Sequence, residues 1–391
     1  MALHYLDNSA TTPLNHAAKN AMLTVMNENF GNPSSLHSIG VSAEEARENA
    51  RSSVLYAISG NPRAKAEQLI FTSGGTEANN IALLGAVTAK ARNKGKKIIV
   101  GASEHASVLN TAAHLAVLGY KVVYIDTPGG VWDSQAYERA VDRDTILVSA
   151  MLVNNETGAV NDINRIAATA RDRNPDVIIH TDAVQGFMKL DKNLASLDAD
   201  LISVSGHKIG APKGIGALYQ NERMVKTRAL CPIIFGGGQE KGMRSGTENM
   251  IGIVGFGAAT EYHSANFADF SVKLSSLRAY LGSQLIAMPQ IHVNTPQTER
   301  KAKHIVSVTV PGIKSETMLH HLSSEGVFVS SGSACSSNGS HTDAALKSFG
   351  LSDDEADCTI RISLSETNTT DDIDALISAM QSGIDRLVRK S

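Results

Sequence analysis

The sequence predicts an α/β protein of two domains, a large one with a mainly parallel β-sheet flanked by helices and a smaller α+β one. A length of 391 residues exceeds what one minimal core needs, so two domains are expected. Between residues 73 and 219, short apolar runs alternate with helical patterns, and this alternation is typical of a parallel sheet. A polar, glycine-rich stretch at 235–247 ends the alternation, and we place the smaller domain after it.

The expected elements of the large domain follow one another in a regular order. Each expected strand is a short run rich in Val and Ile, as in strands that are covered on both faces. We expect these strands at residues 97–100, 121–125, 146–153, 177–181, 201–205 and 215–219. Helical patterns separate several of them, at residues 76–93, 106–118 and 163–173.

The half of the chain after the glycine-rich stretch has a different order of elements. A long helical region begins at Met250 and continues to about Met288. Strand patterns return at residues 305–310 and 326–330, with helical patterns before and after them. This mixture of helices and strands predicts the smaller α+β domain.

Composition and charge indicate a globular protein and argue against several classes of partner. Hydrophobic residues make up 42% and charged residues 19%, which is an ordinary soluble composition. The formal net charge of −3 argues against nucleic acid or an anionic membrane as the main partner. No apolar run approaches the roughly 18 residues that a membrane-spanning helix needs, and the N-terminal residues lack the apolar core of a signal peptide. We therefore expect a cytoplasmic protein.

Three cysteines are present, Cys231, Cys335 and Cys358. Their odd number and the lack of a CxxC pair argue against a disulfide framework or a zinc site, and we expect no bound metal. Cys335 lies among small polar residues at 330–341, and we expect a mobile, exposed loop there. Exposed free thiols are a liability in a soluble protein unless they are used. We expect Cys231 and Cys358, which lie beside apolar residues, to be buried and inert.

Polar side chains follow four of the expected strands at the point where each strand ends. These side chains belong to Glu104 and His105, residues 154–156, Asp182 and Gln185, and residues 205–208. In open parallel sheets, ligands bind beyond the carboxyl ends of the strands. Because these four strand ends converge on one edge of the sheet, we expect the polar side chains to form a single site.

Residues 72–77 read Thr-Ser-Gly-Gly-Thr-Glu and precede a good helical pattern. The two glycines allow backbone N–H groups to point at a ligand, and the start of a helix favours an anion. The segment is therefore a candidate phosphate site. The alternative is an ordinary helix start, in which Ser73 or Thr76 caps the helix and Glu77 lies near its positive end.

Lys208 closes a Ser-Gly-His-Lys turn directly after an apolar strand. A lysine is usually a solvated surface charge, but a desolvated lysine can have a lowered pKa and act as a nucleophilic amine. Enzymes that use pyridoxal 5'-phosphate (PLP) need such a lysine, an acidic partner for the pyridinium nitrogen and a phosphate site. Asp182 is a suitable acid. His105 is either a polar residue at a helix start or a residue that stacks on the pyridine ring and exchanges protons.

Eight motifs occur along the chain in a fixed order. They are residues 5–13 (YLDNSATTP), 30–35 (FGNPSS), 72–77 (TSGGTE), 154–156 (NNE), 180–185 (HTDAVQ), 205–208 (SGHK), 244–248 (RSGTE) and 330–335 (SSGSAC). On these motifs the chain resembles, nearly from end to end, the cysteine desulfurases of the NifS/IscS type. Those proteins are class V, fold-type I PLP enzymes. Eight motifs in the same order make a chance similarity implausible.

The resemblance implies the domain organisation of PLP fold type I. The large PLP-binding domain would span residues 16–262 and hold a mainly parallel, seven-stranded sheet flanked by helices. The small α+β domain would combine residues 1–15 with residues 263–391 and would carry the Cys335 loop. The resemblance also implies a homodimer.

The resemblance implies a cofactor site for PLP. Lys208 would hold PLP as a Schiff base, Asp182 would pair with the pyridinium nitrogen, and Gln185 would bond the ring phenolate. His105 would stack on the ring. The phosphate would be held by residues of both subunits, namely Gly75, Thr76, Ser205 and His207 of one subunit and Thr247 of the other.

The resemblance also implies how the substrate, L-cysteine, would be bound and used. The implied substrate-binding residues are Asn32, Asn155 and Arg361, with Arg361 as a fork for the carboxylate. Cys335 would take the sulfur as a persulfide, and L-alanine would leave. The catalytic residues would be Lys208, Cys335 and His105. The persulfide would pass to an acceptor protein, such as an iron–sulfur scaffold or a tRNA-thiolation enzyme.

Two departures from the family pattern leave the sulfur acceptor open. Residues 336–341 after Cys335 differ from the usual segment, and no second arginine follows Arg361. Three alternative functions also remain. A selenocysteine lyase needs no acceptor thiol, and a class V aminotransferase has no use for the Cys335 loop. A non-catalytic binding protein would keep only the fold.

Overall fold

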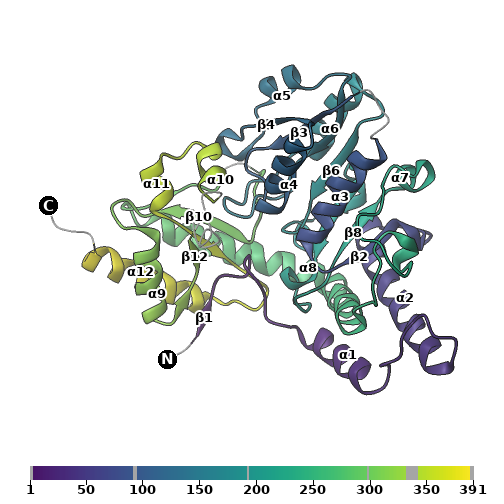
Figure 1. The fold of residues 1–391 in the computed structure, drawn as a ribbon. Helices are drawn as coiled ribbons and strands as arrows, with labels where there is room; N and C mark the ends of the chain where they lie inside the picture. Colours follow the sequence, from purple (N-terminus) through teal and green to yellow (C-terminus); the bar gives the residue numbers. More distant parts are fainter. Residues whose placement is uncertain (1–2, 91–94, 192, 297–298, 332–341, 388–391) are drawn as a thin grey trace.

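The computed structural model describes residues 3–90, 95–191, 193–296, 299–331 and 342–387. Figure 1 shows the described chain as a larger and a smaller part, which the long helix α8 (Met250–Ile286) connects. The smaller part contains the N-terminal strand as well as the residues that follow α8. Among the described residues, we find no helix with the length and apolar character needed to cross a membrane.

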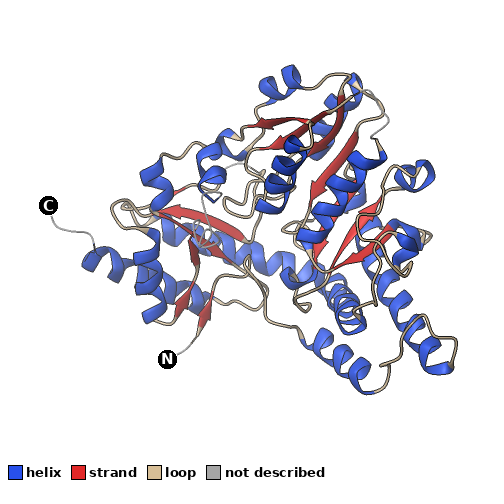
Figure 2. Ribbon diagram, viewed as in Figure 1, coloured by secondary structure: helices blue, strands red, loops and turns tan. Residues whose placement is uncertain are grey.

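A seven-stranded sheet forms the centre of the larger part (Figure 2). In spatial order its strands are β2 (Leu69–Thr72), β8 (Gly216–Gln220), β7 (Leu201–Ser205), β6 (Ile178–Asp182), β5 (Thr145–Ser149), β3 (Lys97–Gly101) and β4 (Lys121–Ile125). The strands from β7 to β4 pair in parallel, whereas β8 pairs antiparallel with both β7 and β2. The expected mainly parallel sheet of seven strands is therefore confirmed.

Helices cover both faces of this sheet, which explains why its strands are apolar on both sides. On β5, Val148 packs into one core and its neighbour Leu147 into another. One face is covered by α2 (Ser38–Ser59), α5 (Ser134–Ala140), α6 (Ile163–Arg173) and the start of α8. The other face is covered by α3 (Gly75–Ala89), α4 (Ala106–Val117) and α7 (Glu222–Thr227). Helix α1 (His16–Asn27) packs beside α2 on α8.

The smaller part contains one four-stranded sheet and one pair of strands. In spatial order the sheet consists of β12 (Ser330–Ser331), β13 (Thr359–Ser363), β10 (Ile305–Thr309) and β9 (His292–Val293). The pair consists of β1 (His4–Tyr5) and β11 (Val327–Phe328), which run parallel. The helices are α9 (Ser315–Ser324), α10 (Thr342–Phe349), α11 (Asp353–Asp357) and α12 (Thr370–Leu387). Leu6 and Leu376, from opposite ends of the chain, lie in the same core.

The expected domain boundary between residues 262 and 263 falls inside α8. Ile253 and Phe256, near the start of α8, belong to a core of the larger part. Leu277 and Leu281, further along the same helix, belong to the core of the smaller part. Helix α8 therefore contributes to both cores, and the boundary stays a prediction.

Several elements differ in extent from the sequence-based expectations. The expected strand at 146–153 is reduced to β5, although the N–H groups of Ala150 and Leu152 still donate to carbonyls of β6 at 3.0 and 2.9 Å. The expected strand at 326–330 is two short strands, β11 and β12, which belong to different sheets. The sequence did not predict β2 or β13. The remaining short helices are 3₁₀ turns: η1 (Ala66–Gln68), η2 (Pro128–Gly130), η3 (Leu194–Ser196), η4 (Gly206–Lys208) and η5 (Glu240–Gly242).

The expectation that Cys231 and Cys358 are buried is wrong, because each is partly exposed. Cys231 borders a surface cavity beside α2, which leaves its side chain incompletely covered. Cys358 is the residue that ends the short helix α11. Apolar neighbours in the sequence therefore did not imply burial at either position.

Candidate active site

Lys208 lies at the end of η4, directly after β7, and its amine meets the N-terminal segment of the chain. Its Nζ donates hydrogen bonds to the carbonyl oxygens of Ser9 at 2.5 Å and Ala10 at 2.8 Å. The Thr12 hydroxyl donates to the carbonyl of His207 in the same turn at 3.0 Å. The segment before α1 thus fixes the position of the lysine amine, which is a role that sequence patterns did not indicate.

Asp182 ends β6, the parallel neighbour of β7, and is buried. Its Oδ2 accepts a hydrogen bond from Nδ2 of Asn79 at 2.7 Å, and its Oδ1 accepts from the backbone N–H of Val184 at 3.0 Å. Asn79 lies one turn into α3 and also donates to Ser107 at 2.9 Å. A buried carboxylate held by two donors is suited to accept from a protonated ring nitrogen.

His105 precedes α4, and its ring is held by the first turn of that helix. Its Nδ1 accepts a hydrogen bond from the backbone N–H of Ser107 at 3.1 Å and lies 2.8 Å from the Ser107 hydroxyl. Burial lowers the pKa of His105, the nearby Asp182 opposes this shift, and Lys208 adds to it. A neutral ring with Nδ1 as acceptor carries its proton on Nε2. Such a ring can stack on an aromatic system and exchange a proton.

Gln185 lies in the turn after β6, and its side-chain amide is oriented from both sides. Its Nε2 donates to the Ser9 carbonyl at 2.9 Å, so that Gln185 and Lys208 share one acceptor. Its Oε1 accepts from Nζ of Lys189 at 3.3 Å. Burial lowers the pKa of Lys189 to about 7, and the charge of Lys208 adds to this shift. The sequence analysis did not identify Lys189 as a site residue. The only sequence feature that could have indicated its contact is its position four residues after Gln185.

The segment 72–77 forms a cradle at the start of α3. Gly74 precedes the helix with a φ of 153°, and no side chain caps the helix start, so the interpretation of Ser73 or Thr76 as a cap is wrong. A Cβ atom on Gly75 would lie 2.8 Å from Cγ2 of Val184, which shows how closely the backbone approaches the turn after β6. Free N–H groups at a helix start favour an anion.

Ser205 lies beside this cradle, whereas Nδ1 of His207 lies 3.2 Å from the Thr11 hydroxyl in the N-terminal segment. The Ser205 hydroxyl is buried and has no hydrogen-bond partner among the described residues. A Cβ atom on Gly74 would lie 4.0 Å from this hydroxyl. Burial lowers the pKa of His207 to about 4, and the neighbouring Lys208 adds to this shift. An orphaned hydroxyl beside helix N–H groups fits the phosphate of PLP, because each of these groups can donate to a phosphate oxygen.

Arg361 reaches the site from β13 of the smaller part, and its guanidinium meets two carboxylates. Its Nη2 contacts Oδ1 of Asp7 at 3.0 Å, and its Nη1 contacts Oε1 of Glu156 at 3.2 Å. Nη1 also donates to the carbonyl of Asn155 at 3.1 Å. Burial raises the pKa of both Asp7 and Glu156, and Arg361 opposes the rise. The structure therefore brings Asn155 and Arg361 together, as expected for a substrate site.

Glu104 is a further buried acid, and it lies near Asp182. Glu104 accepts a hydrogen bond from the backbone N–H of Met151, and its Oε2 has no partner among the described residues. Burial raises the pKa of Glu104 well above its usual range, and the charge of Asp182 adds to this rise. Glu104 follows the end of β3, where the sequence placed it, and its side chain is buried there like that of Asp182.

The structure does not bring three of the expected site residues into this group, and one of them is not described. Cys335 lies outside the described residues. Thr247 is exposed on the glycine-rich loop, and Asn32 is exposed with its Oδ1 accepting from the N–H of Ser34 at 2.9 Å. The roles of all three stay predictions. In the part of the chain that is described, no group of three or more acidic, histidine or cysteine side chains could hold a metal ion.

Comparisons with known proteins fit this arrangement. The family model described as aminotransferase class-V matches residues 4–376. The cysteine desulfurase IscS of Methanosarcina thermophila is 38% identical over 384 residues, which cover 98% of this chain and 92% of that protein.

Solved structures give the same result. A NifS-like protein has a TM-score of 0.89 at 32% identity and covers 98% of this chain and 100% of its own. A structure described as SspA in complex with cysteine has a TM-score of 0.77 at 32% identity, over 94% of this chain and 100% of that one. The chain therefore belongs to the class-V aminotransferase family, and its resemblance to the cysteine desulfurases of that family is confirmed.

Proposed function

We propose that this protein is a PLP-dependent cysteine desulfurase, which takes sulfur from L-cysteine and releases L-alanine. The observation that carries the proposal is the position of Lys208 and Asp182 at the ends of neighbouring strands, beside the cradle at Gly75. A lysine, a buried carboxylate and an anion site at one edge of a sheet are what a PLP enzyme requires. The names of the relatives add the substrate class.

The described residues offer a partner for each part of the cofactor. Lys208 is the amine that would carry it, and Asp182 would accept from its ring nitrogen. The Gln185 amide would bond the ring phenolate, and the phosphate would bind at Gly75 and Ser205. When bound, PLP supplies an electron sink for the charge that develops at the Cα atom of an amino acid.

Lys208 and Arg361 would handle the amino-acid part of the substrate. The Nζ atom of Lys208 would take the Cα proton and hold it, with its position fixed by the two carbonyls at 2.5 and 2.8 Å. Arg361 would orient the substrate carboxylate as a two-pronged donor. Because Asp7 and Glu156 already contact this guanidinium, the substrate must compete with at least one of them.

Cys335 would take the sulfur as a thiolate nucleophile. Its sulfur attacks the sulfur of the substrate, so that an S–S bond forms and the C–S bond of the substrate breaks. The electron pair of the broken bond goes to carbon, which is then protonated and leaves as L-alanine. The persulfide on Cys335 would pass to an acceptor protein, either an iron–sulfur scaffold or a tRNA-thiolation enzyme.

The proposed active unit is a homodimer in the cytoplasm. The exposed position of Thr247 on the glycine-rich loop supports a contact with the phosphate site of a second subunit. Asn32, which is also exposed, would join the substrate site in the same assembly.

The test compares the wild-type protein with Lys208→Ala and Cys335→Ser. The wild type should bind PLP with a visible absorbance band, release L-alanine from L-cysteine and carry a persulfide. Lys208→Ala should lose the band and all turnover, since no amine remains to carry the cofactor. Cys335→Ser should keep the band but release little alanine, because a serine hydroxyl is a poor nucleophile near neutral pH.

Two outcomes of this test would contradict the proposal. A Lys208→Ala protein with the wild-type band would show that another lysine carries the cofactor. Near-normal alanine release from L-cysteine by Cys335→Ser would exclude the persulfide step. Turnover of selenocysteine in that variant would then favour a selenocysteine lyase.

A further inference from the structure

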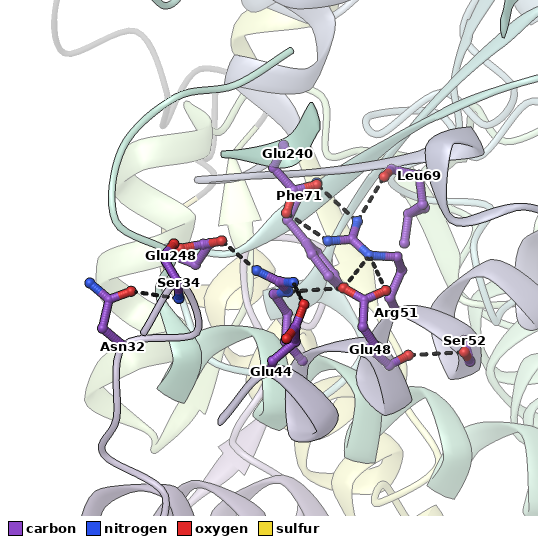
Figure 3. A network of polar contacts seen from close by, with 11 residues as sticks. Asn32, Ser34, Glu44, Glu48, Arg51, Ser52, Leu69, Phe71, Glu240 and Glu248 are labelled. Atoms are coloured by element: carbon purple, nitrogen blue, oxygen red, sulfur yellow. Dashed lines mark hydrogen bonds and ion pairs between the residues drawn. The ribbon is translucent and has the colours of Figure 1, made fainter. Parts of the chain in front are cut away.

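The glycine-rich loop, residues 235–247, is fixed to the sheet by a buried ion pair between Arg51 of α2 and Glu240 (Figure 3). Two parallel hydrogen bonds of 2.8 Å join the guanidinium of Arg51 to the two carboxylate oxygens of Glu240. The relative exposure of the two residues is only 6% and 9%. A bidentate arginine–carboxylate pair of this kind fixes both position and orientation.

The same pair also binds the edge strand of the seven-stranded sheet. Nη1 of Arg51 donates to the carbonyl of Leu69 at 2.8 Å, and Glu240 accepts from the N–H of Phe71 at 3.0 Å. The guanidinium lies over the Phe71 ring, 4.8 Å from its centroid. Leu69 and Phe71 belong to β2, the strand that leads into the cradle. The ion pair therefore connects the loop to the strand that positions the cradle.

Two more ion pairs hold the far end of the loop, on either side of Thr247. Arg47 of α2 contacts Glu248 at 2.6 Å. Arg244 contacts Glu77, at the start of α3, at 2.8 Å. The loop also borders a cavity of about 1050 Å³, which is lined by both charged and apolar side chains. These three ion pairs attach the loop to α2 and to the start of α3.

The backbone at this attachment is strained. Glu240 and Lys241 have φ values of 50° and 55°, in the left-handed region that non-glycine residues rarely adopt. Two consecutive residues in this region persist only when the surrounding contacts hold them there. The side chain of Glu240 contacts Arg51 and Phe71, whereas the side chain of Lys241 is exposed. Backbone hydrogen bonds also close the turn, from the N–H of Gly242 to the Gly238 carbonyl at 2.9 Å and from the N–H of Met243 to the Glu240 carbonyl at 3.0 Å. The ion pair is the side-chain contact that fixes this turn to α2 and β2 and so helps to oppose the strain.

We propose that the Arg51–Glu240 pair holds the glycine-rich loop in this strained form and so positions Thr247 for the phosphate site of a second subunit. The inference rests on the proposed function, because it assumes a PLP-binding homodimer. Arg51 and Glu240 are positioning residues, since they act on the cofactor only through the loop. A loop that is fixed before association loses less conformational entropy when the two subunits meet.

The experiment uses Glu240→Gln, in which an amide oxygen can still accept from the Phe71 N–H. The charge that holds Arg51 is lost, so the loop should relax while β2 keeps its edge contact. Hydrogen exchange of backbone amides 238–247 should become at least about tenfold faster than in the wild type. The rate at which PLP leaves the dialysed holoenzyme should rise by about the same factor, because ordering of the loop and cofactor binding are linked. Amides of β2 should be unchanged.

Lys241→Gly provides the rescue that separates positioning from a general loss of stability. Glycine adopts a positive φ without strain. Added to Glu240→Gln, this change should restore most of the PLP retention, because the turn then adopts the same backbone conformation with less strain. Glu222→Gln is the matched control, since it breaks an exposed pair with Lys226 and should change neither measurement.

Three results would overturn the proposal. The first is unchanged exchange of the loop in Glu240→Gln, and the second is a relaxed loop with unchanged PLP retention. The third is a lack of rescue by Lys241→Gly. Should Glu240→Gln fail to fold, Arg51→Lys tests the same pair with the same expectations, because lysine keeps the charge but cannot donate the two parallel hydrogen bonds to Glu240. A wild-type protein that is monomeric by sedimentation or binds no PLP would contradict the proposed function and, with it, the role of Thr247. The exchange data would then decide only whether the pair holds the loop.

Discussion

The two candidate anion sites of this protein differ in how their polar groups are satisfied. In the cradle, the Ser205 hydroxyl is buried without a hydrogen-bond partner among the described residues, and the start of α3 carries no side-chain cap. At the other site, the guanidinium of Arg361 already contacts Asp7 and Glu156. The cradle can therefore accept an anion without breaking a contact. At Arg361, the carboxylate of the substrate must displace that of Asp7 or Glu156.

This difference suits the two ligands. A cofactor that stays bound benefits from a site that is formed in advance, because little free energy is spent on rearrangement. A substrate that enters and leaves in each cycle does not need such tight binding. Because L-cysteine must displace Asp7 or Glu156 from Arg361, its affinity is limited. The same two carboxylates keep the buried guanidinium paired when no substrate is bound.

The largest effect is expected from Arg361→Lys, which tests whether the substrate site depends on a fork. Lysine keeps the positive charge for Asp7 and Glu156 but cannot donate two parallel hydrogen bonds to a carboxylate. The kcat/KM for L-cysteine should fall by at least about a hundredfold, mainly through KM. The PLP absorbance band of the resting protein should be unchanged. A loss of that band would show that Arg361 acts on the cofactor site instead.

A smaller effect is expected from Ser205→Ala, which tests whether the cradle is formed in advance. The change removes a buried hydroxyl for which the described part of the chain offers no hydrogen-bond partner, so the protein without PLP should be as stable as the wild type or about 1 kcal/mol more stable. Retention of PLP should fall about tenfold, because one hydrogen bond to a charged phosphate is lost. Thermal unfolding without PLP and equilibrium dialysis with PLP check the two parts separately.

Ser203→Ala is the matched control on the same strand. The Ser203 hydroxyl lies 3.0 Å from Nε2 of the fully buried His180, so its removal should lower stability by about 1 kcal/mol. It should leave PLP retention unchanged, since Ser203 lies in the middle of β7, whereas Ser205 lies at its carboxyl end beside the cradle. If both serine variants lose stability and keep PLP equally well, the cradle does not use Ser205.

The positions of Lys208 and Asp182 at neighbouring strand ends were predictable from the sequence, whereas the pairing of Arg361 was not. Polar residues that follow apolar runs identified Lys208 and Asp182, because the ends of parallel strands must meet at one edge. The contacts of Arg361 join residues 354 and 205 positions apart, from β13, the N-terminal segment and the edge of the sheet. No local pattern encodes such a pairing. The resemblance gave Arg361 a role but did not indicate its two acidic partners.

The same reason explains what was missed elsewhere in the fold. Strand β2 has only four residues and pairs antiparallel with β8 at the edge of the sheet, and its short apolar run was missed although α3 and β3 follow it in the chain. Its outward N–H and carbonyl groups are satisfied by Glu240 and Arg51, a pair 189 positions apart. Recognition of β2 as a strand therefore depends on its tertiary contacts rather than on its own four residues.

The smallest effect is expected from Asp7→Asn, which tests competition at Arg361 directly. Asparagine keeps the shape of the side chain and removes one of the two negative charges that face the guanidinium. If Asp7 competes with the substrate carboxylate, KM for L-cysteine should fall about two- to fivefold at neutral pH. The kcat should change little, because Asp7 would not take part in the chemical step.

The pH dependence of this effect follows from the pKa of Asp7, which burial raises while Arg361 opposes the rise. Above the raised pKa the wild-type side chain is charged and competes, so the KM values of the wild type and Asp7→Asn should differ most there. As pH falls through the raised pKa, Asp7 takes up a proton and the two KM values should converge. Steady-state kinetics across this range measures the difference. A KM that rises in Asp7→Asn at every pH would show that Asp7 orients Arg361 for the substrate rather than competing with it.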